Sequence, residues 1–319
     1  MTGVFLPDQR SIVARLPSVA ADLEAAGYSS IWSGEVGNTD ALVPAVLVAS
    51  GTASAGVAAV LNVYTRAPTA LAMSAATLAD AAPGRAAIVL GASSRLFVER
   101  WNGIPFTSPV ARVRDVLRFL RQALTGGRVD GDFATFSTSG FRLQEAPAHP
   151  PSLLVAASSP QMTRLAAQEA DGVVVNWVAA GDLDRIGELP SDRAQVTMVM
   201  VVCPTEDRDA VEAVARPLMA SYLVSPAYAD VQRRVGRGPA LAAMWEAWGR
   251  GDAAGAQQAL PREVIDELIV WGTPEGCAVR LAAIGRDAGA QVVTMALLPH
   301  GAAFEEVARS YAPGAALRT

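Results

Sequence analysis

Residues 153–177 read LLVAASSPQMTRLAAQEADGVVVNW and contain a strand, a helix and a second strand. The apolar run from Leu153 to Ala156 is typical of a buried strand, and the run from Val173 to Val175 is a second one. Between them an amphipathic helix begins at Pro160, where the missing proline N–H costs nothing, and runs to Ala170. A strand, a helix and a strand in succession are typical of parallel α/β folds.

The same alternation extends along the whole chain of 319 residues. It predicts eight strands, at residues 3–6, 30–33, 57–63, 86–90, 153–156, 173–175, 196–202 and 292–296. It also predicts helices at residues 12–26, 42–50, 109–124, 160–170 and 274–288, and a further helix that begins at Pro68. Eight strands separated by helices indicate a (β/α)8 TIM barrel, here as one domain over residues 1–319. The alternative is a doubly wound open sheet, but its usual GxGxxG after the first strand is absent.

Two segments depart from this alternation. Residues 126–150 are expected to form a hairpin, with Asp130-Gly131 as its turn. Residues 204–272 show a helical pattern with no clear strand, interrupted at Pro226, Gly236 and Pro239. We expect a helical insertion between strands seven and eight, which either covers the mouth of the barrel or only decorates its outside.

Composition excludes several classes of function. The net charge of −5 and the lack of a basic stripe argue against nucleic-acid binding. The chain has no lysine, so Schiff-base chemistry and a P-loop lysine are excluded. His149 and His300 are the only histidines, so a site built on several histidines is impossible and no metal is expected. Cys203 and Cys277 form no CxxC and are expected to be buried, reduced thiols.

The sequence shows no signal of membrane association. The first residues lack the basic and then apolar pattern of a signal peptide, and every apolar run is far shorter than the roughly 18 residues of a membrane span. A soluble cytoplasmic protein is therefore expected.

In barrels of this type the site forms from the loops that follow the strands. After the second strand, Glu35 and Asp40 are two carboxylates, either of which could act as an acid or base if burial raised its pKa. The alternative is that Asp40 caps the helix that begins near Leu42 and that Glu35 pairs with an arginine.

Polar or small residues also follow the third and fourth strands. Asn62 interrupts an apolar strand, where its side chain needs hydrogen-bond partners or faces a ligand. A bulge there would present backbone groups to a flat ring. Gly91, followed by Ala92 and Ser93, lets a ligand approach the backbone.

The loop after the fifth strand carries the signature of a helix start. Ser158 or Ser159 can cap the helix, and Ser158 with Gln161 has the spacing of a capping box. Free N–H groups and hydroxyls at such a start bind phosphate, although a capped helix without a ligand is an equal alternative.

Taken in order, these loops resemble the luciferase-like monooxygenase superfamily. Within it they are similar to the actinobacterial branch that uses the deazaflavin coenzyme F-420. The stretches that carry the resemblance are AAGYSSIWSGE, TRAPTALAMSAATLADAAPGRAAIVLGAS, VERWNGIPFTSPVARVRDVLRFLRQAL, LLVAASSPQMTRLAAQEADGVVVNW and WGTPEGCAVRLAAIGRDAGA.

The resemblance implies a barrel that pairs as a homodimer, with a non-prolyl cis peptide in a bulge near Asn62. It implies hydride transfer between coenzyme F-420 and a small organic substrate; the alternatives are an FMN-dependent monooxygenase and a cofactor-binding member without turnover. The cofactor-binding residues it implies are Leu61, Asn62, Val63, Gly91, Ala92, Ser93, Ala157, Ser158, Ser159, Gln161 and Met162.

Two positions depart from the pattern of the resembling proteins. Many of them carry a histidine after the acid that follows strand two, but Val36 follows Glu35 here. F-420-dependent dehydrogenases often place a glutamate where this chain has Ala92-Ser93-Ser94. Glu35, Asp40 or water must therefore supply the proton.

Overall fold

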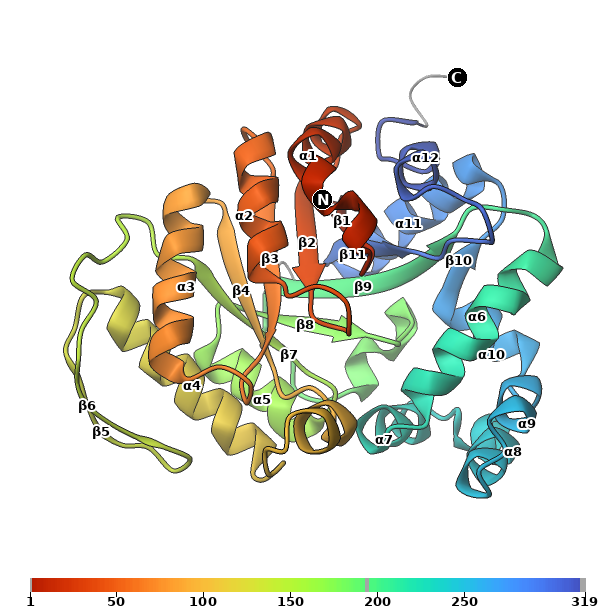
Figure 1. Ribbon diagram of the computed structural model, residues 1–319. Coiled ribbons are helices and arrows are strands. Elements are labelled where there is room, and N and C mark those ends of the chain that lie inside the picture. The colour runs from red at the N-terminus through yellow and green to blue at the C-terminus, as the bar shows by residue number, and fades with distance from the viewer. Residues whose placement is uncertain (1, 193–194, 316–319) are drawn as a thin grey trace.

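The computed structural model describes residues 2–192 and 195–315, and a closed parallel barrel lies at its centre (Figure 1). Its eight strands are β1 (Thr2–Phe5), β2 (Ser30–Gly34), β3 (Gly56–Asn62), β4 (Ala86–Gly91), β7 (Ser152–Ala156), β8 (Gly172–Asn176), β9 (Val196–Cys203) and β11 (Gln291–Ala296). Each strand pairs in parallel with the next in this order, and β11 pairs with β1, which closes the barrel. The (β/α)8 prediction is confirmed.

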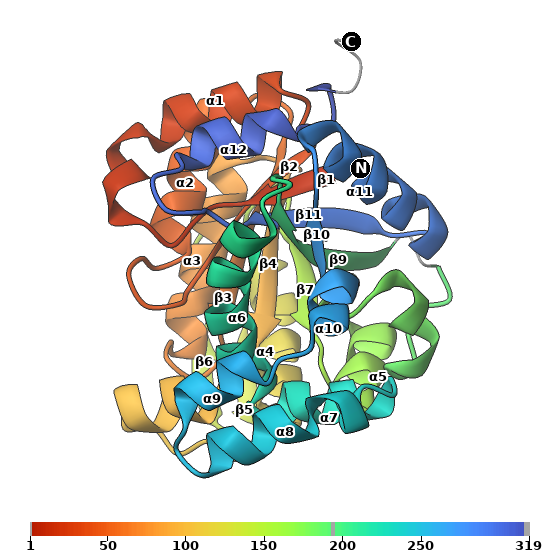
Figure 2. The same cartoon turned by 90° about the vertical axis from the view of Figure 1, so that its right-hand side faces the viewer.

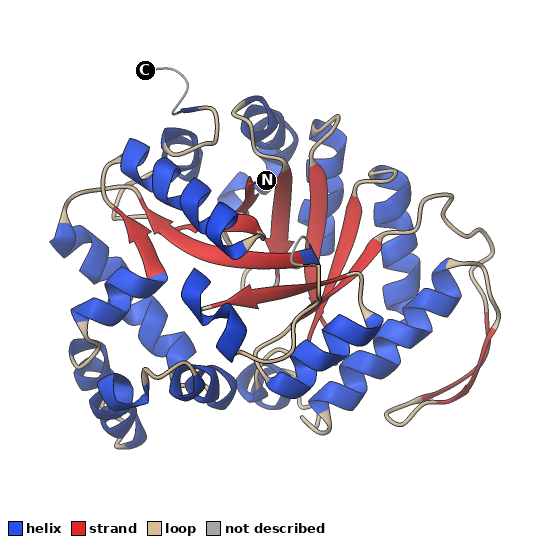
Figure 3. Ribbon diagram, turned by 180° about the vertical axis from the view of Figure 1, so that it is seen from behind, coloured by secondary structure: helices blue, strands red, loops and turns tan. Residues whose placement is uncertain are grey.

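Helices surround the barrel, as the view from behind shows (Figure 3). They are α1 (Leu16–Ala25), α2 (Leu42–Gly51), α3 (Pro68–Ala81), α4 (Pro109–Leu124), α5 (Pro160–Glu169), α11 (Pro274–Ala288) and α12 (Phe304–Ser310). The predicted helix at 12–26 instead opens with a 3-10 helix, Arg10–Arg15. Pro17 occupies the first turn of α1, where its missing N–H is tolerated, so the α-helix begins only at Leu16.

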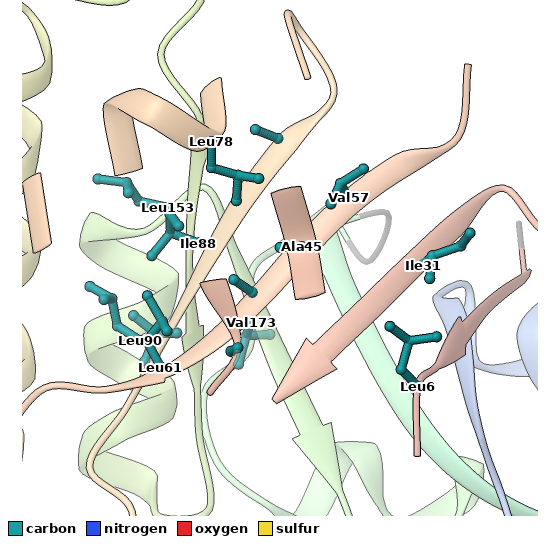
Figure 4. Packing of buried hydrophobic residues seen from close by; sticks show 14 of the residues in the cluster. Leu6, Ile31, Ala45, Val57, Leu61, Leu78, Ile88, Leu90, Leu153 and Val173 are labelled. Atoms are coloured by element: carbon teal, nitrogen blue, oxygen red, sulfur yellow. The ribbon is translucent and has the colours of Figure 1, made fainter. Parts of the chain in front are cut away.

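Side chains alternate between the inside and the outside of the barrel, as they must along a strand. Outward residues such as Val57 and Ile88 pack in the core between the strands and α2 and α3 (Figure 4). Inward residues form a smaller cluster inside the barrel. Its members are Phe5, Trp32, Ala58, Val60, Ala87, Val89, Leu154, Ala156, Val174, Val199 and Val293. This alternation decides which residues at the strand ends can face a ligand.

The segment at 204–272 is helical, as predicted, but it ends in a strand. Its helices are α6 (Arg208–Leu223), α7 (Pro226–Arg234), α8 (Gly238–Gly249), α9 (Ala253–Gln258) and α10 (Arg262–Leu268). The strand β10 (Ile269–Trp271) then pairs with β9. The expectation of no strand was wrong, because β8 pairs with β9 only as far as Val199, and the edge of β9 beyond that point pairs with the short strand β10.

The hairpin after α4 is present, but its turn is not where the sequence suggested. Its strands are β5 (Val129–Asp132) and β6 (Ser137–Phe141), so Asp130 and Gly131 lie within the first strand. The connection runs from Phe133 to Phe136, whose rings stack at 4.6 Å and contact the ring of Phe119 on α4. This aromatic packing, which a local turn pattern does not reveal, fixes the position of the turn.

Over the described ranges, 2–192 and 195–315, no helix combines the length and the apolar character needed to cross a lipid bilayer.

Candidate active site

The carboxyl ends of the parallel strands meet at one end of the barrel, toward which the arrow of β2 points in Figure 1. Helices α7 and α8 lie at that same end (Figure 2). Two hydrogen bonds join α7 to the end of β8: Asn176 Nδ2 donates to Tyr228 Oη at 2.9 Å, and Gln232 Nε2 donates to the Trp177 carbonyl at 2.6 Å. The insertion therefore covers the β8 side of the barrel mouth.

Glu35 and Asp40, the two predicted acids, occupy different environments after β2. The Glu35 carboxylate forms an ion pair with the Arg66 guanidinium, and the exposed fractions of the two side chains are 8% and 22%. Arg66 follows β3, so the pair ties together the loops after β2 and β3 at the mouth. The exposed Asp40 instead accepts the backbone N–H groups of Leu42 at 2.8 Å and Val43 at 3.0 Å. Both structural contacts considered from the sequence are therefore present.

Asn62 is the predicted site residue whose side-chain NH2 group most clearly lacks a hydrogen-bond partner among the described residues. It is only 4% exposed, and its Oδ1 accepts the backbone N–H of Tyr64 at 2.8 Å. That bond fixes which end of the amide is the oxygen, so the NH2 group points elsewhere. Asn62 Nδ2 is buried and has no partner within the described residues. A buried donor of this kind is costly unless a ligand accepts from it.

Alternation shows that Asn62 faces the barrel interior while its neighbours do not. Ala58 and Val60 on the same strand face inward, and Asn62 is two residues further along. Leu61 and Val63 pack in the outer core, so they can offer only backbone atoms to the site.

The expected bulge and cis peptide at the end of β3 were wrong. The β3–β4 register runs without interruption to Asn62 opposite Gly91, and Val63 N still donates to Gly91 O at 3.1 Å. Every described peptide bond is trans. The physical reason is local: the Asn62 side chain satisfies the N–H of Tyr64 after the strand ends, so the chain leaves the sheet through an ordinary side-chain turn.

Small residues lie beside Asn62 at the mouth. A methyl group placed on Gly91 would lie 3.6 Å from the Cβ of Ala156, which faces inward from β7. Beyond Gly91, Ser93 has a left-handed φ of +61°, and Ser94 Oγ accepts the N–H of Phe97 at 3.3 Å. The inward positions of β4 and β7 between Asn62 and Asn176 thus carry only small residues, Gly91 and Ala156.

The loop after β7 starts α5 as predicted, with one correction. Ser159 is the N-cap, and its Oγ accepts the N–H of Met162 at 3.3 Å. The proposed capping box between Ser158 and Gln161 was wrong, because the cap lies one residue later and the third helical position is therefore Met162. Ser158 Oγ has no partner among the described residues, which leaves it available to a ligand.

The other residues of this loop have different surroundings. Ala157 and Met162 are buried in the outer core, and Gln161 is exposed. Arg164 is tied to Glu188 by an exposed ion pair at 3.1 Å. Its guanidinium is thus already engaged on the surface.

Sequence reasoning missed an aromatic group at the end of β8. The ring centroid of Tyr222 lies 5.2 Å from that of Trp177 and 5.9 Å from that of Tyr228. Burial raises the pKa of Tyr228 to about 12. Burial also raises the pKa of Tyr222, and the negative charge of Asp8 raises it further. Asn176, which anchors Tyr228, repeats the signal of Asn62: an asparagine at the end of an apolar strand.

An apolar rim borders the opposite side of the mouth. The π-helix Leu96–Trp101 follows β4, and its Leu96 and Trp101 side chains are exposed. A methyl group on Gly37, in the loop after β2, would lie 3.9 Å from the Trp101 ring. The loops after β2 and β4 therefore lie close to one another at the mouth.

Comparison with known proteins decides the family. The family model for luciferase-like monooxygenases matches residues 2–291. The chain belongs to the luciferase-like monooxygenase family. The 5,10-methylenetetrahydromethanopterin reductase of Archaeoglobus fulgidus is 28% identical over 250 residues, which cover 73% of this chain and 74% of that protein. A Mycobacterium tuberculosis protein, provisionally named a coenzyme F-420-dependent oxidoreductase, is 25% identical over 317 residues, covering 89% and 90% of the two chains.

A solved structure extends the likeness to three dimensions. The coenzyme F-420-dependent tetrahydromethanopterin reductase from Methanopyrus kandleri superimposes with a TM-score of 0.79 at 21% identity. The match covers 97% of this chain and 96% of that one. The luciferase-like fold therefore extends over nearly the whole chain, the helical insertion included.

Proposed function

We propose that this protein is an oxidoreductase that transfers a hydride between coenzyme F-420 and a small organic substrate at the carboxyl end of its barrel. The observation that carries the proposal is the Asn62 Nδ2 group beside Gly91, which is buried, faces inward and has no hydrogen-bond partner within residues 2–192 and 195–315. The names of the curated relatives, which include F-420-dependent oxidoreductases, support the choice of coenzyme.

The residues at the mouth suit a flat, hydrogen-bonding ring. Gly91 and Ala156 leave space where larger side chains would fill the mouth, and Asn62 offers a donor that carbonyl groups on a deazaflavin would accept. The ring side of the coenzyme would thus lie over β4, between Asn62 and Asn176.

The start of α5 suits the coenzyme's phosphodiester. Ser158 supplies a hydroxyl with no partner among the described residues, and the helix supplies backbone N–H groups and the positive end of its dipole. We propose that Ser158 and the α5 backbone hold this phosphate, while Ser159 is occupied as the helix cap.

When bound, the coenzyme supplies the hydride chemistry, and the protein supplies position and a shielded site. The Glu35–Arg66 ion pair would hold the loops after β2 and β3 together beside the deazaflavin ring. Helix α7 covers the mouth on the β8 side. We keep Glu35 as a group that orients substrate through its ion pair, and we assign Asp40 to the helix cap.

We also propose that the protein works as a homodimer formed through α2 and α3. Val43 on α2 and Met73 on α3 are both large apolar side chains that are more than half exposed. Light scattering at micromolar concentration should give twice the mass of one chain, and a monomeric mass would reject this assembly.

Activity is tested by mixing the purified protein and reduced F-420 with a panel of ketones, aldehydes, enones and imines. Oxidation of the coenzyme that depends on both protein and substrate supports the proposal. Tight F-420 binding without turnover of any compound would instead indicate a binding protein. Activity with reduced FMN and oxygen alone would indicate a monooxygenase.

A further inference from the structure

Tyr228 is held over the interior of the barrel by a strand-end asparagine. Asn176 lies two residues after the inward-facing Val174 and pairs with Val199, which also faces inward. Its side chain therefore projects into the mouth, where Nδ2 donates to Tyr228 Oη at 2.9 Å. Since α7 carries Tyr228, the insertion places a phenol at the site.

The direction of this hydrogen bond leaves the phenol proton available. Asn176 donates to the oxygen, so the Tyr228 O–H must donate to some other acceptor, and the hydroxyl makes no other hydrogen bond among the described residues. The Tyr222 ring packs edge-on against the Tyr228 ring and restricts its position. Burial raises the pKa of Tyr228 to about 12, so the phenol keeps its proton in neutral solution.

Three carboxylates at this end of the barrel are already engaged in other contacts. Glu35 is paired with Arg66, and Asp40 caps α2. Asp8, which lies near Tyr222, accepts hydrogen bonds from Asn38 and Thr39. The side-chain amide of Asn62 is no proton source. Tyr228 is therefore the neutral acid best placed to serve a reaction there.

We infer that Tyr228 donates its proton to the oxygen of a carbonyl substrate, and that Asn176 is the positioning residue that aims it. This inference rests on the proposed function. The carbonyl carbon, or the β-carbon of an enone, would receive the hydride from the reduced coenzyme, which would be oxidised by two electrons, and the carbonyl oxygen would receive the Tyr228 proton. A ketone or aldehyde would give an alcohol, an enone would give an enol that tautomerises to the saturated ketone, and solvent would return a proton to the phenolate.

Three variants test the inference. Tyr228→Phe removes the acid and keeps the ring, and Tyr222→Phe is the matched control in the same aromatic group. Asn176→Asp replaces the donor by an acceptor that would capture the phenol proton. With reduced F-420 and the carbonyl panel, we expect Tyr228→Phe to lower kcat about 100-fold or more. Asn176→Asp should lower it about 10-fold or more, and Tyr222→Phe should leave it within about threefold of the parent.

A second readout does not depend on turnover. The C=O stretch of 13C-labelled 2-cyclohexen-1-one, measured by infrared difference spectroscopy with oxidised F-420 bound, should shift to lower frequency in the parent and in Tyr222→Phe. The shift should be absent in Tyr228→Phe, while Tm and F-420 affinity stay unchanged. A kcat of Tyr228→Phe equal to that of the parent, or a carbonyl stretch that is not shifted in the parent, would overturn the inference.

The two proposals fail in different ways. If the parent binds F-420 and turns over imines but none of the ketones, aldehydes or enones, the role of Tyr228 is wrong and the coenzyme assignment stands. If the parent does not bind F-420, both proposals fail together.

Discussion

Asn62 on β3 lies directly opposite Gly91 on β4, so a buried amide projects into the barrel mouth beside a position that has no side chain. The two residues complement each other, because the amide supplies a donor and the glycine supplies the room for a ligand to reach it. Ala156, the next inward residue around the barrel, extends this room.

Gly91 gives a matched pair of variants. Gly91→Ala should fold with a stability within about 1 kcal/mol of the parent, because the added methyl meets Ala156 at an ordinary contact distance of 3.6 Å. It should reduce F-420 affinity only a few-fold. Gly91→Leu should fill the space and weaken binding at least 100-fold. Fluorescence titration of the folded variants checks both; equal affinities for the two would show that the ring lies elsewhere.

Replacing each of the two serines at the start of α5 should affect a different property of the protein. Ser159→Ala should cost about 1 kcal/mol of unfolding free energy, because it removes the N-cap. Ser158→Ala should leave stability unchanged but weaken F-420 binding about 10-fold or more, since a hydrogen bond to a charged group contributes roughly 1.5–3 kcal/mol. Urea unfolding and a binding titration measure the two effects. Parental affinity in Ser158→Ala would move the phosphate site away from α5.

The Glu35–Arg66 ion pair should contribute to stability as a unit. Glu35→Gln and Arg66→Met should each lower the unfolding free energy by about 1–3 kcal/mol, because each leaves a partly buried charge without its partner. The double variant should be less destabilised than the sum of the two. A double-mutant cycle from urea unfolding measures this coupling, and strict additivity would show that the two side chains do not interact in solution.

Acid should weaken the packing between α1 and the segment that leads into β3. Glu24 accepts the backbone N–H groups of Ala53, Ser54 and Ala55, and these bonds lower its pKa from 4.5 to about 2. A lowered pKa in the folded state stabilises the protein above the unfolded pKa, and this contribution is lost as pH falls from about 4.5 to 2.

The measurement is the free energy of unfolding between pH 6 and pH 2 for the parent and for Glu24→Gln. The variant should be less stable than the parent at pH 6, and the difference should shrink toward pH 2. Glu145→Gln, at an exposed position, is the control and should follow the parent throughout. A constant gap between the parent and Glu24→Gln would contradict the prediction.

Local pattern was enough to predict the barrel, because each of its strands is an apolar run and most of the helices begin at a proline, such as Pro68 or Pro160. The strand β10 was missed because three apolar residues directly after a helix show no strand periodicity. The hairpin turn was misplaced because Phe119, on a different element, determines it.

The site residues also fall into those that the local sequence predicts and those that only the tertiary fold brings together. Asn62 was predictable, since this polar residue interrupts an apolar run that was expected to continue to Val63, although β3 ends at Asn62 itself. Asn176 was not singled out, because the predicted strand ends at Val175, whereas β8 extends to Asn176. Tyr228 lies 52 residues further along the chain, and only the tertiary fold brings its hydroxyl to Asn176. Contacts between such distant segments leave no periodic trace in the sequence.

Coenzyme F-420 is proposed to bind over β4 at the barrel mouth. The most direct test is an equilibrium fluorescence titration of the purified parent protein with F-420 and, separately, with FMN, repeated on folded Gly91→Leu. We expect micromolar or tighter F-420 binding to the parent, much weaker FMN binding, and loss of the F-420 signal in the variant. Micromolar binding of FMN with none of F-420, or F-420 binding that Gly91→Leu leaves intact, would contradict it.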